Sequence, residues 1–284
     1  MSWIAAAALL SLIAQAPTPD WQAAAGGNFA FDVASVKKQP PGSFRPPLFP
    51  LDAGDSFTAT GGRFYADFPV TTYITFAYKL MLTPEQRQSI LAGLPKWVSS
   101  DVFEIEAKAP MSNPTKDQLR LMMQSLLADR FHLEIHFETR EMPVYALVVA
   151  TPGKLGPKLR PHEEGRSCDT PAPDLFPGRC RNLALMLRPD NTRIGGARDV
   201  PMDYLAQGIP TLTPLGRPVV DQTGLSGKFD FTIEWLPTGP APAPDSDAPS
   251  FAEALREQLG LKLESTKAPV RTPVIDRVES PSEN

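Results

Sequence analysis

From Gln118 to Val149 the sequence reads QLRLMMQSLLADRFHLEIHFETREMPVYALVV. The apolar residues of its first half recur at helical spacing, at Leu119, Met122, Met123, Leu126 and Leu127. This spacing predicts a helix over 115–130 with one apolar stripe, which belongs to a protein core more often than to a binding groove. The second half alternates between apolar and polar residues, which predicts strands over 132–140 and 143–150, joined by a tight turn near Glu141 and Met142.

The same pattern returns near the end of the chain. From Ala252 the sequence AEALREQLGLKLESTKAPVRTPVIDRV again runs from an amphipathic helix into an alternating strand, a turn and a last strand. Each helix begins with the spacing of a capping box, at Thr115 and Gln118 in the first and at Ser250 and Glu253 in the second.

Earlier segments repeat in the same order. The segment GGRFYADFPVTTYITFAY, from Gly61, resembles NTRIGGARDVPMDYLAQG, from Asn191, and FEIEAKAP, from Phe103, aligns with FDFTIEWLP, from Phe229. A separation of roughly 125–135 residues holds for every segment, and a period of this length indicates duplicated domains rather than a solenoid.

The sequence therefore predicts an α+β fold made of two diverged copies of a β-α-β-α-β-β unit, with mainly antiparallel sheets packed on amphipathic helices. Within the first copy, strand-like pieces at 56–60 and 63–67, split by Gly61 and Gly62, predict a hairpin. The predicted boundaries are a signal peptide over 1–25, a first unit over 29–150, a connection rich in proline and glycine over 151–189, and a second unit over 190–284 with a proline-rich insertion over 237–249.

Composition narrows the class of protein. Apolar residues make up 42% of the chain and charged residues 21%, which is typical of a globular protein. The net charge of −4, without a dense cluster of lysine and arginine, argues against a nucleic-acid partner. No motif indicates a cofactor, since the segment from Gly224 to Lys228 ends like a phosphate loop but lacks its glycine spacing.

The apolar run from Ile4 to Ala14 predicts export. It is too short to cross a hydrocarbon core as a helix, which takes about 20 residues, and it fits a secretory signal peptide. A buried N-terminal helix is the alternative, and no later segment is long and apolar enough to span a membrane. The sequence thus predicts a secreted or periplasmic protein.

The cysteines, Cys168 and Cys180, lie in a stretch rich in proline and glycine. In an exported chain such a pair predicts a disulfide, with two free thiols or half of a metal site as alternatives. Closing a loop this short contributes roughly 3 kcal/mol in the chain-entropy model.

Several segments together are similar to a known family. They are GRFYADFPVTTYITFAY, LPKWVSSDVFEIEAKAP, the stretch from Gln118 quoted above, GRPVVDQTGLSGKFDFTIEW, LREQLGLKLE and the ending VIDRVESPSEN. They resemble, over roughly 29–284, a soil-associated bacterial family with many paralogues in acidobacteria, whose domain has no known function. The resemblance implies secretion or envelope association, and similar domains are joined to membrane metallopeptidases of the antibiotic-sensor type. The β/α order also looks like the short N-terminal domains of secretins and TonB-dependent receptors, an analogy of architecture that does not fix function.

Few residues are candidates for a site. Asp221, in VVDQTG, resembles the aspartic-protease loop, but an extra residue separates it from the following Thr-Gly. We therefore expect a structural turn, in which Gly224 and Gly227 take positive φ and Asp221 accepts hydrogen bonds from backbone amides.

Histidines provide the other candidates. His132, Glu134 and His136 share one face of their predicted strand and are weak candidate ligands for a transition metal, although a solvated sheet face is the more common interpretation. His162 lies in a loop beside Glu163, with no serine or cysteine nucleophile next to it in the sequence.

The sequence names no catalytic residue and favours a binding module over an enzyme. Its partner would be an envelope protein or peptide, taken up at a free sheet edge. The alternative from another class is a hydrolase acting on envelope or plant-derived polymers, with Glu104, Glu106 or Asp221 as acid and base. A sensor domain partnered with a membrane metallopeptidase is a third possibility, which rests on the family resemblance.

Overall fold

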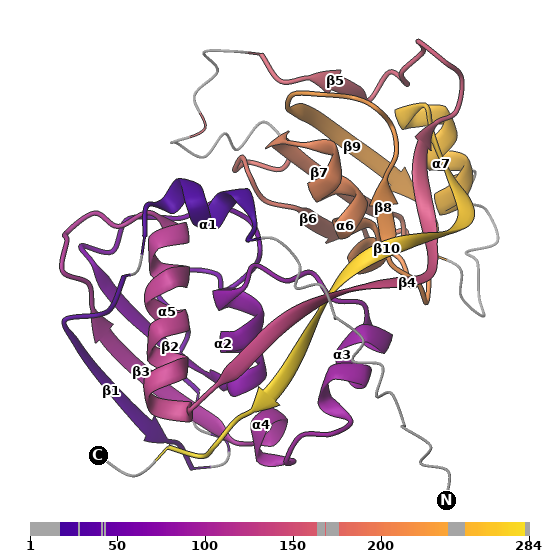
Figure 1. The fold of residues 1–284 in the computed structure, drawn as a ribbon. Coiled ribbons are helices and arrows are strands. Elements are labelled where there is room, and N and C mark those ends of the chain that lie inside the picture. Colours follow the sequence, from indigo (N-terminus) through magenta and orange to yellow (C-terminus); the bar gives the residue numbers. More distant parts are fainter. Residues whose placement is uncertain are drawn as a thin grey trace, which may run out of the picture.

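The helix predicted from residues 118–149 is α5 (Lys116–Phe131), and the two strands predicted after it form one strand, β4 (Glu134–Val149) (Figure 1). The computed structural model describes residues 18–27, 29–40, 42, 44–163, 168, 176–237 and 248–281. The apolar run of the predicted signal peptide and residues 238–247 of the predicted insertion lie outside these ranges.

Helices and strands are mixed along the described chain, with α2, α3 and α4 in succession and β4 to β7 in succession. The other helices are α1 (Asp20–Ala25), α2 (Val70–Ala77), α3 (Pro84–Leu91), α4 (Trp97–Ser100), α6 (Met202–Leu212) and α7 (Phe251–Leu259). The other strands are β1 (Val33–Lys38), β2 (Arg63–Pro69), β3 (Val102–Lys108), β5 (Leu159–Pro161), β6 (Ala184–Leu187), β7 (Arg193–Val200), β8 (Val219–Asp221), β9 (Phe229–Trp235) and β10 (Leu261–Arg277).

Both predicted capping boxes are present. At the start of α5, Thr115 Oγ1 accepts the N–H of Gln118 at 3.1 Å, and Gln118 Oε1 accepts the N–H of Thr115 at 2.9 Å. At the start of α7, Ser250 and Glu253 make the same reciprocal pair at 3.4 and 2.9 Å. Each pair satisfies backbone donors that a helix start leaves without a partner, so both helices begin where local sequence predicts.

The fold consists of two lobes, each with its own antiparallel sheet and apolar core (Figure 1). In the first lobe the strand order is β1-β3-β2, and α2 and α5 supply side chains to the same core. In the second lobe the order is β5-β9-β7-β6, and α6 and α7 complete the core. The α+β class with mainly antiparallel sheets is therefore confirmed.

A long ribbon of β4 and β10 joins the lobes (Figure 1). The two strands pair antiparallel along nearly their whole length, from Leu261 opposite Val149 to Ile275 opposite Ile135. Ile135 and Ile275 pack on the first core, whereas the other end of the ribbon belongs to the second core. Each long helix thus leads into a strand that ends in the opposite lobe.

The predicted turn near Glu141 and Met142 is wrong, because β4 continues through this point as one strand. Backbone N–H groups alternate in direction along a strand, and the N–H of Tyr145 points away from β10 to Pro218 O, at 2.9 Å. Pro143, two residues earlier, therefore has its nitrogen on the same side. The ladder to β10 loses no hydrogen bond at this proline, which is why it does not end the strand.

The predicted hairpin around Gly61 and Gly62 is wrong in its first arm. Residues 63–69 form β2, but residues 56–60 form no strand. The preceding segment instead turns toward the second lobe, where the N–H groups of Asp55 and Ser56 both donate to Arg181 O, at 2.8 and 3.3 Å. The first residue of the predicted arm, Ser56, is thus engaged in a contact between the lobes.

The strands β3 and β9 hold matching positions in their sheets. β3 lies between β1 and β2, β9 lies between β5 and β7, and all of these pairs are antiparallel. Each is followed by a capped helix that leads into one strand of the ribbon. Duplication of a β/α unit remains a prediction from the sequence, as do the boundaries of the two units.

Candidate functional site

A cleft of about 730 Å³ lies between the lobes. Its lining comes from α1, the segment between α2 and α3, the start of α6, β8 and the middle of β10. Its aromatic and charged lining includes Trp21, Asp55, Lys79, Tyr204, Asp221 and Arg271. Cavities of roughly 300–1,000 Å³ are the usual size of small-ligand sites, so this cleft is the first candidate.

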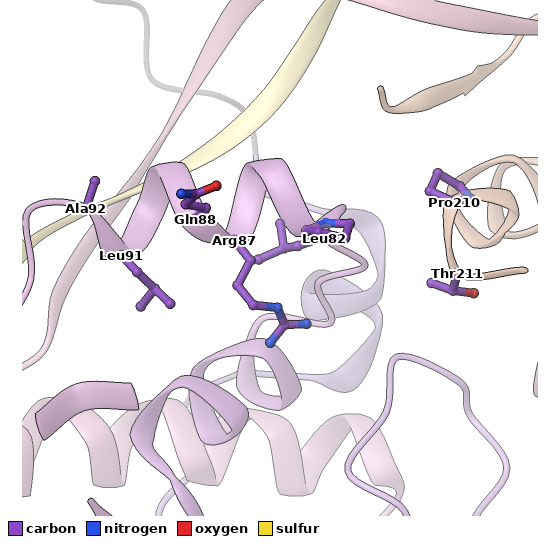
Figure 2. Close-up of a pocket in the computed structure, with 8 residues that line it drawn as sticks. Leu82, Arg87, Gln88, Leu91, Ala92, Pro210 and Thr211 are labelled. Carbon is purple, nitrogen blue, oxygen red and sulfur yellow. The ribbon is translucent and has the colours of Figure 1, made fainter. Parts of the chain in front are cut away.

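A second hollow of about 730 Å³ adjoins the cleft, with Leu82 and Pro210 lining both. In Figure 2, Arg87 and Leu91 extend from one side of α3, and Pro210 and Thr211 of α6 lie apart from this helix at the other end of the lining. None of the residues of α3 is fully buried. The helix is held at its start by a capping box, in which Thr83 Oγ1 accepts the N–H of Gln86 at 3.2 Å.

Two buried cations on α5 shape one end of the cleft. The Lys116 side chain is 2% exposed and its Nζ lies 2.6 Å from Asp52 Oδ1, while the Arg120 side chain is fully buried. Arg120 donates to Asp55 Oδ1 at 2.8 Å and to Gly54 O at 2.7 Å. Burial lowers the pKa of Lys116 even though Asp52 opposes this shift. These bonds fix residues 52–55 against α5.

Gly54 and Asp55, in this loop, contact the second lobe. A Cβ at Gly54 would lie 2.8 Å from Arg181 O and 2.9 Å from Tyr204 Oη, so only glycine fits the approach. Burial alone would raise the pKa of Asp55, but Lys79 and Arg120 outweigh it and hold that pKa below its usual range. Lys79 also lies 5.7 Å from the ring centre of Trp21 on α1. The carboxylate of Asp55 is therefore ionised and already paired at the edge of the cleft.

Arg271 differs from these paired cations. Its guanidinium carbon lies 3.3 Å from the ring centre of Phe137 on β4, and it lines the cleft from β10. Its Nε is buried without a hydrogen-bond acceptor, and within the described chain no ion pair reaches the guanidinium. Burial lowers the pKa of Arg271, since it disfavours the charged form. Arg271 is therefore a partly buried positive charge that pairs with no carboxylate of the described chain, although Asp20, Asp55, Asp203 and Asp221 line the same cleft.

The candidate metal ligands do not meet. His132 ends α5 in the left-handed conformation, φ 46°, and Glu134 pairs with Arg277 at 3.4 Å. His136 Nδ1 lies 2.7 Å from Asp276, which with Glu138 raises the pKa of His136. The one group of three such ligand atoms in the described residues is instead His162, Cys168 and Asp199, and the sulfur of Cys168 belongs to a disulfide.

The Asp221 turn has the expected geometry. Asp221 Oδ1 accepts the N–H and the hydroxyl of Thr223, at 2.8 and 2.7 Å, and Gly224 and Gly227 have φ of 68° and 93°. Asp221 also lines the cleft, which its place in the sequence did not predict.

The other carboxylates considered for hydrolysis do not line the cleft. Glu104 and Glu106 lie on β3 in the first lobe, 3.4 Å from Tyr65 Oη and 3.4 Å from Arg45 respectively. The structure therefore does not bring them together with Asp221.

The disulfide between Cys168 and Cys180 is present. Sequence reasoning had placed no nucleophile beside His162, yet Cys168 Sγ lies 3.8 Å from its Nε2. Sequence reasoning also missed Arg271, for which the one signal is a basic residue inside the apolar run APVRTPVI. The partner that covers its face, Phe137, is in the other strand of the ribbon.

The fold and the cleft define a two-lobed α+β protein with a candidate ligand site between its lobes. The chain belongs to DUF3738, a family described as proteins of unknown function, whose model matches residues 71–278. No curated protein and no solved structure matches the chain. In the described part, no helix combines the length and apolar character needed to cross a bilayer.

Proposed function

We propose that this chain is an exported binding protein of the cell envelope or the extracellular space. We further propose that the cleft between its lobes holds a ligand with an anionic group, a carboxylate or a phosphate, which pairs with Arg271. The unpaired charge of Arg271 is the observation that carries this proposal. The apolar N-terminal run and the disulfide support export.

Arginine remains protonated in proteins, so burial does not remove the charge of Arg271. A buried charge without a partner is destabilising, and an arriving anion would relieve this. The ring of Phe137 covers one face of the guanidinium and leaves the N–H groups at its edge for a planar, bidentate contact with a carboxylate or phosphate. This arrangement supports an anion site rather than a structural ion pair.

The rest of the lining suits an amphipathic ligand. Tyr78, Met81, Leu82 and Val219 supply apolar surface within the same cleft. Lys79 is already paired with Asp55 at 2.7 Å, which leaves Arg271 as the cation without an ion pair in this lining. A ligand with an apolar body and one anionic end matches this distribution.

β10 is an edge strand of its sheet, but its middle is poorly suited to pairing with an added peptide strand. Pro269 pairs with Glu141, and Pro273 pairs with Phe137. Both partners lie an even number of residues from Tyr145, whose N–H points out of the ribbon, so the nitrogens of the two prolines also point outward. Both prolines therefore remove donors that an added peptide strand would need. This favours the cleft over the ribbon edge as the binding site.

The test measures binding of matched probes to the full mature protein by calorimetry. The probes are an N-acetylated apolar tripeptide with a free C-terminal carboxylate, the same tripeptide as its C-terminal amide, and inorganic phosphate. We expect the carboxylate or the phosphate to bind, the amide to bind at least tenfold more weakly, and Arg271→Met to abolish the difference. Arg277→Met, an exposed arginine later in β10, is the control and should bind like the wild type. Equal binding by Arg271→Met and wild type, or no binding of either anion, would overturn the proposal.

Export is tested independently by intact-mass measurement of the form found in the periplasm or medium. A shortened N-terminus and the mass of one disulfide are expected. A full-length mass in the cytoplasmic fraction alone would contradict export without bearing on the cleft.

A further inference from the structure

A histidine in the second lobe has a carboxylate at one ring nitrogen and a sulfur near the other, and none of the three residues lines the cleft. His162 Nδ1 lies 2.6 Å from Asp230 Oδ1, and its other ring nitrogen, Nε2, lies 3.8 Å from Cys168 Sγ. The side chains of His162 and Asp230 are each 11% exposed. This is the order of groups that activates a cysteine nucleophile: a carboxylate orients an imidazole, and the imidazole faces the sulfur.

The fold places the histidine and the carboxylate rigidly. The N–H of His162 donates to Lys228 O at 2.8 Å, directly after β5 pairs with β9. Asp230 belongs to β9, and its Oδ1 also accepts the N–H of Asp199 at 2.9 Å. Because Asp230 can only accept, it favours the tautomer with the proton on Nδ1, which leaves the lone pair of Nε2 toward Cys168.

The neighbouring charges are compensated. Asp199, a second carboxylate near His162, is held by Arg181 at 2.5 Å and by Lys228 at 2.9 Å. These two cations outweigh the effect of burial and keep the pKa of Asp199 below its usual range. The imidazole is therefore left to interact with Asp230 on one side and with the sulfur on the other.

We propose that the Cys168–Cys180 disulfide is redox-active, and that its reduction by a dithiol releases Cys168 as a nucleophilic thiolate activated by His162, with Asp230 as the positioning residue. The redox partner is a dithiol, either a small molecule or a protein. This goes beyond ligand binding in the cleft and does not depend on it.

One thiolate of the dithiol attacks Sγ of Cys168, which is more accessible than the 3%-exposed Cys180, and the S–S bond breaks. Cys180 leaves and takes a proton. The second thiol of the dithiol then attacks the first dithiol sulfur, which is bonded to Cys168; a disulfide forms within the dithiol and Cys168 leaves. The proton of that second thiol goes to Nε2 of His162, so Cys168 remains a thiolate beside an imidazolium.

The first test uses Cys180→Ser in the full chain, which leaves Cys168 as a permanent thiol. Its alkylation by iodoacetamide is followed by mass spectrometry from pH 5 to 9, with a chelator present. An ordinary cysteine is only about 1% thiolate at pH 6.5, so an activated one reacts far faster there. We expect at least a tenfold higher rate at pH 6.5 than in Cys180→Ser/His162→Gln, and an intermediate rate with Asp230→Asn. His136→Gln, which removes a histidine paired with Asp276, is the matched control and should change nothing.

A second test keeps the disulfide intact. The wild type and His162→Gln are equilibrated with mixtures of reduced and oxidised dithiothreitol. Loss of the imidazole should raise the ratio needed for half-reduction about tenfold, since the reduced form is no longer stabilised. If His162→Gln leaves both the alkylation profile and this midpoint unchanged, the disulfide is only a structural cross-link and the proposal is wrong.

Discussion

Replacing Arg120 with methionine is expected to destabilise the protein by about 3 kcal/mol, near the lower end of the range for breaking a buried ion pair. The guanidinium is fully buried and binds Asp55, Asp117 and the carbonyl of Gly54. Methionine fills a similar volume, so the loss reports these bonds rather than a cavity. The estimate stays low in the range because Asp55 and Asp117 are 42% and 25% exposed and can be rehydrated.

Urea denaturation followed by circular dichroism measures this loss directly, and a melting curve should shift down by roughly 6 °C, at about 2 °C per kcal/mol for a chain of this size. Lys267→Met, on the exposed middle of β10, is the control and should fall within about 0.5 kcal/mol of the wild type. If Arg120→Met unfolds within about 1 kcal/mol of the wild type, the loop at 52–55 is not anchored by this cation.

Further predictions concern two helix ends and the dependence of stability on pH. Gly260→Ala should destabilise the protein by about 2–5 kcal/mol, because φ at this position is 70° and the new Cβ would lie 2.5 Å from Gly156 N. His132, at the matching end of α5, has φ 46° although it is not a glycine, so His132→Gly should stabilise the protein by about 0.5–1 kcal/mol. The same urea titrations measure both, and a loss of stability in His132→Gly would refute the reasoning. The folded-state pKa of Asp55 is lowered, so its contribution is complete above the unfolded value of about 3.9 and is lost as the pH falls through the folded pKa. Asp55→Asn should therefore show a smaller drop in stability below about pH 4 than the wild type, and equal drops would contradict the assignment.

Local signals predicted α5 and α7 together with their starts, whereas α1, α3 and α4 were not predicted. The capping pairs at Thr115 and Ser250 act within one helical turn, and the apolar stripe of α5 depends only on residues in that helix. The disulfide was predicted from the isolated cysteine pair and from the expectation of export. These features need no knowledge of distant segments.

The predicted turn near Glu141 and Met142 was wrong because the strand there depends on a distant segment. Proline and the neighbouring Glu-Met look like a turn when the strand is considered alone. The continuous strand is stable because β10 pairs with it over its length, and that partner lies more than a hundred residues away, as the contact from His136 to Asp276, 140 residues apart, shows. Because N–H groups alternate in direction along a strand, a proline one residue earlier or later would have removed a hydrogen bond to β10, whereas Pro143 does not.

The candidate sites depend on the same long-range pairing. Arg271 and Phe137 meet because β10 and β4 are neighbours, and His162 meets Asp230, 68 residues away, because β5 pairs with β9. The sequence by itself determined the α+β class, the capped helices and the cysteine pair, since periodicity, capping and composition act over short distances. Only the tertiary structure decided that β4 runs unbroken and which charges are left without partners, since these depend on the surfaces that strand pairing brings together.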